Sequence, residues 1–169
     1  MIQFLGGALV PVGERGADRA LSTSLALAGG PGYHFLGGVG TYLELGVSPL
    51  NVDEDSGGKG ARLFWISPQV TLGRHRPGFH AFVLLGAGYH RHSSRSDGGL
   101  ALTADGLGYN FGLGVESDSV PLVGFFRFQR MSGSVDANPP YDVGFQDEPD
   151  LTLSVVWIGI SIEALLEVY

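Results

Sequence analysis

Apolar side chains recur at every second position through most of this sequence, in eight stretches separated by segments rich in glycine and polar residues. Because successive side chains of a β-strand point to opposite faces, a period of two predicts strands rather than helices. The predicted strands are Ile2–Val12, Leu21–His34, Gly38–Leu50, Ala61–Gly73, Phe79–Arg91, Gly106–Glu116, Val120–Met131 and Leu151–Leu165.

The connections between these strands alternate between long and short. The long ones are Gly13 to Ala20, Asp53 to Gly60, His92 to Asp105 and Asp136 to Asp150, and the tight ones are Phe35 to Gly37, His75 to Gly78 and Ser117 to Ser119. This alternation is typical of a transmembrane β-barrel with tight turns at one end and loops at the other. An even number of strands lets the last pair with the first, which removes every free edge. We therefore predict an all-β fold, an eight-stranded antiparallel up-and-down barrel formed by residues 1–169 as one domain.

The two faces of the predicted strands differ in charge. Four ionisable residues lie well inside strands and share the face opposite the more regular apolar one: Glu44, Glu116, Arg127 and Glu163. A lipid-facing Arg or Lys at mid-depth costs about 2–4 kcal/mol, so the apolar face is predicted to point outward. The interior of an eight-stranded barrel is filled by side chains. We expect Gln69, Asn110 and Gln129 to join the four ionisable residues in a polar network inside the lumen.

Glycine and aromatic residues have predicted places in this barrel. Glycine accounts for 28 of the 169 residues, and inner-face glycines are expected to make room for Trp65, Tyr42 and Phe125. Aromatic residues near the strand ends are predicted to form interfacial girdles, and these are Phe64, Phe79, Tyr89, Tyr109 and Phe128. Pro68 conflicts with the pattern because it lies in mid-strand and lacks an N–H, which predicts a bulge or a break there.

The composition of the chain excludes several classes of structure and function. No run of 18 apolar residues occurs, which argues against a membrane-spanning helix. The net charge of −7 argues against nucleic acid as a partner. The chain has no cysteine and hence no disulfide or thiol chemistry. Met1 runs directly into apolar strand residues without a signal-peptide pattern, so an exported barrel requires that its signal peptide has been removed.

Four segments carry a resemblance to a known family. They are Gly86-Ala87-Gly88-Tyr89, the run from Tyr109 to Glu116, Phe126-Arg127-Phe128 and the run from Trp157 to Ile162. With them the chain resembles the small eight-stranded outer-membrane β-barrels of Gram-negative bacteria, the OmpA- and OmpX-like group. The resemblance implies a location in the bacterial outer membrane, with termini and short turns toward the periplasm and long loops outside. It also implies that the final aromatic residue, Tyr169, is the signal read by the insertion machinery.

Two groups of residues suggest further chemistry. His90 and His92 share a strand face, with Ser93 and Ser94 beside them at the loop-side rim. This group suggests either a metal site at the rim or the His/Ser pair of a lipid hydrolase. A metal site would need a third ligand. Acidic clusters suited to a divalent cation are Asp53, Glu54 and Asp55, and Asp142, Asp147, Glu148 and Asp150. Both groups are more typical of solvated loops and rims, so we predict no metal site, no cofactor and no catalytic residue.

The sequence thus favours a non-enzymatic outer-membrane barrel that contacts membrane lipid. Its external loops are expected to meet a protein partner, the segment from Tyr141 to Asp150 with Phe145 being the favoured contact. The protein is expected to act as a monomer or as a subunit of a membrane assembly. Two alternatives remain open: a soluble up-and-down barrel that binds a small hydrophobic ligand, and an outer-membrane lipid hydrolase that uses His90 or His92.

Overall fold

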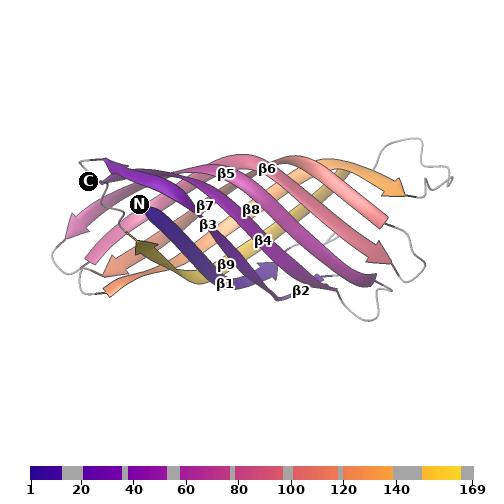
Figure 1. Ribbon diagram of the computed structural model, residues 1–169, viewed down its shortest axis with the longest axis horizontal. Coiled ribbons are helices and arrows are strands. Elements are labelled where there is room, and N and C mark those ends of the chain that lie inside the picture. Colours follow the sequence, from indigo (N-terminus) through magenta and orange to yellow (C-terminus); the bar gives the residue numbers. More distant parts are fainter. Residues whose placement is uncertain are drawn as a thin grey trace.

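The computed structural model describes residues 1–12, 21–35, 38–52, 58–76, 79–96, 101–117, 120–138 and 150–164. They form the strands β1 (Ile2–Pro11), β2 (Leu21–Ser22), β3 (Ser24–Phe35), β4 (Val39–Val52), β5 (Gly58–Arg76), β6 (Phe79–Ser96), β7 (Ala101–Ser117), β8 (Val120–Asn138) and β9 (Asp150–Ala164). Only Thr23 separates β2 from β3, and both pair with β4, so β2 extends β3 and eight strands build the wall. Figure 1 shows how these strands are arranged. Among the described residues, no helix is long and apolar enough to cross a membrane.

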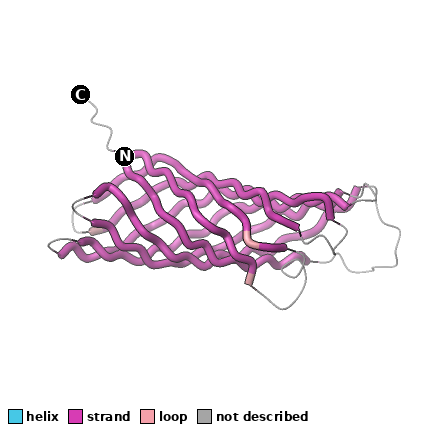
Figure 2. The backbone as a smooth tube through the Cα atoms, turned by 90° about the horizontal axis from the view of Figure 1, so that it is seen from below, coloured by secondary structure: helices cyan, strands magenta, loops and turns pink. Residues whose placement is uncertain are grey.

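Every strand of the wall pairs antiparallel with the strands before and after it in the sequence, and β1 closes the sheet against β9 (Figures 1 and 2). The paired residues can be followed once around the wall: Met1, Gly32, Tyr42, Gln69, Gly86, Asn110, Gln129, Val155 and Pro11. From Met1 to Pro11, one circuit advances ten residues along β1. For eight strands, that advance corresponds to a strand tilt of about 40°. The structure confirms the predicted eight-stranded antiparallel barrel.

Several strands are longer than predicted at the end of the barrel that carries the longer connections. The predicted connection from His92 to Asp105 is mostly strand, because β6 continues to Ser96 and β7 begins at Ala101. β8 continues to Asn138 instead of ending at Met131, and β5 begins three residues earlier than predicted. The prediction ended each strand where its outward face becomes polar. Hydrogen bonding between strands does not depend on that polarity, and the ladders continue beyond it.

Pro68 neither breaks β5 nor creates a bulge, and both predicted alternatives were wrong. Its side chain is exposed on the outer face, and it stands opposite Leu43 of β4. On the other side, the β5–β6 ladder omits Ser67 and Pro68 and resumes at Gln69 in unchanged register. The missing N–H therefore removes one local section of the ladder, while the flanking pairs keep the strand continuous.

Inner-face glycines make room for large neighbours, as predicted. A Cβ on Gly46 of β4 would meet the indole ring of Trp65 on the adjacent strand β5. A Cβ on Gly159 would meet the ring of Phe125 as well as backbone of β1, and one on Gly32 would meet Tyr42. The narrow interior of an eight-stranded barrel requires this alternation of small and large side chains.

Candidate functional site

A buried ion pair lies at the centre of the lumen. Glu44 projects inward from β4 and Arg127 from β8, and Arg127 Nη1 donates to Glu44 Oε2 at 2.8 Å. The two side chains are 0% and 1% exposed. Trp65 of β5 donates its indole N–H to the other carboxylate oxygen of Glu44 at 2.5 Å. Both oxygens of the buried carboxylate thus accept a hydrogen bond, which is the condition for keeping such a charge inside a protein.

Aromatic rings surround the guanidinium of Arg127. Its central carbon lies 4.2 Å from the ring centre of Trp157 and 5.9 Å from that of Phe125. Trp157 packs edge-to-face against both Trp65 at 5.4 Å and Phe125 at 5.1 Å. A cation over an aromatic face is attracted by the ring quadrupole, most strongly where water is excluded. The ion pair and three aromatic side chains therefore form one unit, here called the central cluster: Glu44, Arg127, Trp65, Trp157 and Phe125.

The other polar residues predicted for the lumen are less well connected. Gln69 of β5, Asn110 of β7 and Gln129 of β8 are buried, and Asn110 donates to the hydroxyl of Ser67 at 3.5 Å. The side-chain amide atoms of Gln69 and Gln129 are buried without a hydrogen-bond partner. The structure brings these residues into one region of the lumen, but their hydrogen bonds do not join them to Glu44 and Arg127.

Glu116 and Glu163 differ from the rest of the predicted network. Glu116 lies at the turn end of β7, half-buried, with its carboxylate 3.5 Å from Nδ1 of His80. It therefore belongs to the rim and not to the central cluster. Glu163 pairs with Gln3 across the β1–β9 seam, and its side chain lies outside the described residues. Tyr169 and the acidic segments at 53–55 and 142–148 also lie outside them.

The lumen is largely apolar toward the end that carries the longer connections, although Ser48 and His92 are buried there beside Leu63. This apolar region was not expected from the sequence. Beyond the central cluster, fully buried aliphatic side chains pack together, and these are Leu9, Leu63, Met131, Leu153 and Val155. At the opposite side of the cluster, the space left beside Arg127 amounts to about 10 Å³, roughly the volume needed to hold one water molecule. The inward-facing side chains thus form a polar centre, with a layer of mainly apolar side chains on its loop side.

The two histidines singled out from the sequence point into this lumen, so the expectation of a solvated rim pair was wrong. His90 is 0% and His92 is 6% exposed, and His90 Nδ1 lies 3.1 Å from the carbonyl oxygen of Gly88. Strand alternation directs Ser93 to the other face, away from both rings, and keeps Ser94 on the same face as the rings. Among the described residues, no group of three or more His, Cys, Asp or Glu side chains is arranged to hold a metal ion.

The outer face carries a continuous apolar band. Exposed aliphatic and aromatic side chains cover all strands except β2, for example Leu85 of β6 at 51% and Leu113 of β7 at 61% exposure. Toward the loop end, the outward residues become polar on six strands. On β4, the last apolar outward residue before this change is Val47, and Pro49 and the polar Asn51 follow it. On β5 to β9, the last apolar and the first polar outward residue are, in strand order, Phe64 and Arg62, Tyr89 and Arg91, Leu107 and Asp105, Phe128 and Arg130, and Val156 and Ser154.

The five aromatic residues predicted for the girdles all lie on this outer face. Phe64 and Tyr89 are the last apolar outward residues before the polar zone on β5 and β6, and Tyr109 is one position further in on β7. Phe79 stands at the turn end of β6, and Phe128 packs against Phe111 at 5.4 Å. Their contact with a membrane interface stays a prediction.

Comparison with solved structures places this architecture among known barrels. The chain matches the crystal structure of Neisserial surface protein A with a TM-score of 0.63 and 11% identity, over 95% of this chain and 94% of that chain. It matches Ail, the attachment invasion locus protein of Yersinia pestis, with a TM-score of 0.56 and 16% identity, over 95% of each chain. A major outer membrane protein from Thermus thermophilus matches with a TM-score of 0.50 and 11% identity, over 96% of this chain and 99% of that chain.

No protein-family profile and no curated protein sequence matches the chain. At 11–16% identity, the similarity to the solved structures concerns the fold. The chain therefore has the fold of the small eight-stranded outer-membrane β-barrels, the group that its sequence resembles.

Proposed function

We propose that this protein is a non-enzymatic β-barrel of the bacterial outer membrane, which anchors its loop-bearing end at the cell surface. The observation that carries the proposal is the apolar band around a closed barrel. On the outer face, the charged side chains with a described exposure are Arg62, Arg91, Arg95, Asp105, Arg130 and Asp136, all beyond the band toward the loop end. A surface of this kind suits hydrocarbon in the band and water beyond it.

The filled lumen supports an anchoring role over a conducting one. The central cluster and the aliphatic layer above it occupy the interior with fully buried side chains. An aqueous pathway would require a lumen free of such side chains, as in barrels with many more strands. We propose that the ion pair serves to hold the two opposite walls together.

The loop end is proposed to contact a partner. The connections there span 12–20, 53–57, 97–100 and 139–149, whereas those at the opposite end have only two or three residues between strands. The segment from Tyr141 to Asp150, proposed as the main contact, lies outside the described residues except for its last position. A barrel with a rigid wall is a suitable scaffold for loops that bind.

The two other hypotheses fit the geometry less well. A soluble ligand-binding barrel would place its apolar face inward and its charges outward, but here the exposed outer face is apolar. A hydrolase that uses His90 or His92 would need a nucleophile bonded to the ring. Ser93 faces the opposite side, and Ser94 shares the inner face, but Nε2 of each ring is buried without a hydrogen-bond partner.

Membrane fractionation followed by gel mobility tests the proposal. We expect the protein in the outer-membrane fraction, extracted only by detergent, with the unheated protein migrating as a compact band distinct from the boiled one. In planar bilayers the purified barrel is expected to show no steady conductance. Recovery in the soluble fraction without a heat-dependent shift would overturn the proposed location, and stable channels would overturn the anchoring role.

A further inference from the structure

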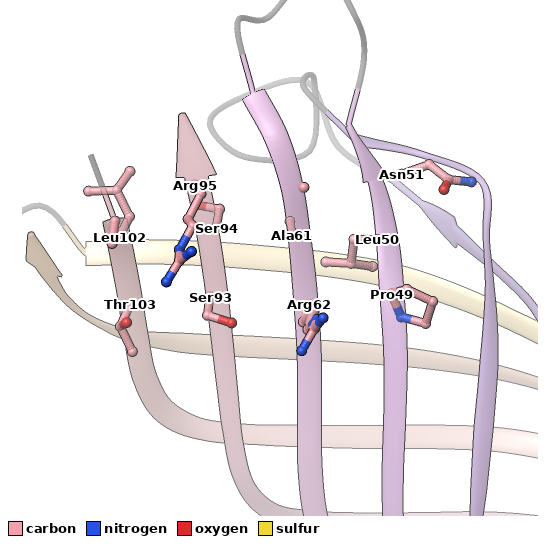
Figure 3. A pocket seen from close by; sticks show the side chains of 12 residues that line it. Pro49, Leu50, Asn51, Ala61, Arg62, Ser93, Ser94, Arg95, Leu102 and Thr103 are labelled. Carbon is pink, nitrogen blue, oxygen red and sulfur yellow. The ribbon is translucent and has the colours of Figure 1, made fainter. Parts of the chain in front are cut away.

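Two hollows of the barrel differ in their surroundings. The hollow at the loop end lies beyond the apolar band, with the outward Arg62 and the inward Leu50 in its lining (Figure 3), so its polar groups can bond to water. The second hollow, of about 680 Å³, lies within the band. Two rows of outward residues on β5, β6 and β7 line it: Pro68, Ala87 and Tyr109, and beside them Val70, Leu85 and Phe111.

The wall of the second hollow contains a backbone acceptor that the sheet leaves without a donor. The N–H of Gly73 on β5 donates to the carbonyl of Gly38, on the β4 side, at 2.7 Å. Because the backbone polar groups point to alternate sides along a strand, position 68 faces β6, where the register places it opposite Ala87. Proline has no N–H, so the Ala87 carbonyl receives no hydrogen bond from β5. The amide of Gln69, inside the wall, has no hydrogen-bond partner either.

Tyr109 brings a hydrogen-bond donor to the same face. Its side chain is 50% exposed, and its hydroxyl makes no hydrogen bond to another described residue. Ala87 and Tyr109 are paired across β6 and β7. Each lies four residues, about 13 Å along its strand, from the first polar outward residue, which is Arg91 on β6 and Asp105 on β7. The acceptor and the donor therefore lie at a similar depth inside the band.

Lipid tails can fill this hollow, but they cannot bond to either group. In hydrocarbon, an unpaired carbonyl or hydroxyl has no water to replace the missing partner. A protein partner satisfies both groups only if it presents a donor and an acceptor at the same depth of the membrane. The face formed by β5, β6 and β7 itself presents this combination, so a second copy of the chain is complementary to it.

We propose that this face pairs two copies of the chain in the membrane, with Tyr109 of each copy seated in the hollow of the other. Its hydroxyl donates to the Ala87 carbonyl of the second copy, and the small Ala87 side chain lets the two walls approach closely. The inference rests on the proposed outer-membrane location, where all copies insert in the same direction. A twofold axis along the membrane normal then keeps each residue at its depth, and both contacts form together.

Fluorescence energy transfer between copies in lipid vesicles tests the proposal. The chain has no cysteine, so S132C, beyond the band on β8, carries either the donor or the acceptor dye while the protein-to-lipid ratio is varied. We expect transfer that rises to saturation with this ratio. Y109F is expected to weaken association about tenfold, because each pair loses two hydrogen bonds in the membrane. Y33F, which removes an exposed tyrosine hydroxyl on β3, is the control and is expected to associate like the wild type.

P68A removes the cause of the unpaired carbonyl and leaves Tyr109 unchanged. The alanine N–H is expected to bond to the Ala87 carbonyl within the sheet, so the copies lose this acceptor and associate about tenfold more weakly. Adding Y109F to P68A is then expected to weaken association little further, because the two substitutions break the same contact. Two independent effects on the wall would add instead.

Three results would overturn the proposal: a wild-type protein that stays monomeric at every ratio, equal losses in Y109F and Y33F, or additive losses in P68A and Y109F. The first would mean that lipid tails occupy the hollow. The heat-dependent gel shift is measured on every preparation. A shifted wild-type band without energy transfer refutes this inference alone, whereas a wild-type protein without the shift refutes the proposed function.

Discussion

Replacing Glu44 by Gln removes the negative charge of the central cluster with almost no change in its shape. Glu44 is fully buried, and it is the ion-pair partner of Arg127 at 2.8 Å. In the wild type, the indole N–H of Trp65 donates to Oε1 of Glu44, and the side-chain oxygen of a glutamine at this position can still accept that hydrogen bond. The substitution therefore isolates the effect of leaving the Arg127 guanidinium charged and without its counter-ion.

The expected loss follows from the burial of the pair. Removing one partner of a buried ion pair costs about 3–5 kcal/mol, mainly because the other charge remains desolvated. The ring of Trp157 at 4.2 Å from the guanidinium stays in place and offsets part of this cost, by about 2 kcal/mol at most. We expect E44Q to lower the free energy of unfolding by about 2–4 kcal/mol.

The double variant E44Q/R127M distinguishes the cost of an orphaned charge from a general loss of packing. Methionine fills much of the volume of the arginine stem, and replacing a buried ion pair by apolar residues is often neutral. The double variant is expected to lie within about 1.5 kcal/mol of the wild type, so that the second substitution restores stability.

Urea unfolding in lipid vesicles, followed by tryptophan fluorescence, measures these free energies directly. Both tryptophans of the chain adjoin the pair, so their emission reports on the cluster itself. An E44Q protein as stable as the wild type would refute the reasoning, and so would a double variant less stable than E44Q.

Three further predictions use the same unfolding assay. Q129L is expected to be neutral or to raise stability by about 1 kcal/mol, because the buried amide of Gln129 has no hydrogen-bond partner; a loss above that amount would contradict it. G46V is expected to cost about 1–3 kcal/mol and to shift tryptophan emission, since the new side chain overlaps the Trp65 ring; unchanged emission would contradict it. L85R is expected to cost about 2–4 kcal/mol and S132R close to nothing, because Leu85 lies in the apolar band and Ser132 beyond it; equal costs would contradict the placement of the band.

Much of the fold could be predicted from the sequence because strand alternation is a local property. The outward positions of the predicted strands, such as Leu43 and Leu45 or Leu113 and Val115, are those that the structure exposes. The strand ends could not be predicted at the loop side. There the outward residues become polar, which in a sequence looks like a loop, although the backbone pairing of Arg91 with Asp105 continues the sheet.

The candidate site was predicted only in part. Alternation places Glu44 and Arg127 on the inner face, but their meeting depends on the barrel bringing β4 and β8 to face each other. The aliphatic layer was missed because Leu9 and Leu63 occupy inner positions in strands whose outer positions are equally apolar, so neither face stands out. One feature of the sequence could have indicated the contact of Trp65 with Glu44. Gly46, which pairs with Trp65, leaves space for the indole ring.

Spin-label accessibility in lipid vesicles measures whether an apolar band in lipid surrounds a filled lumen. The chain has no cysteine, so single labels can be introduced at Leu85 in the band, Ser132 beyond it and Gln129 inside. We expect the label at 85 to collide mainly with oxygen, the label at 132 mainly with a water-soluble nickel complex, and the label at 129 with neither. A label at 85 that is more accessible to the nickel complex than to oxygen would contradict it.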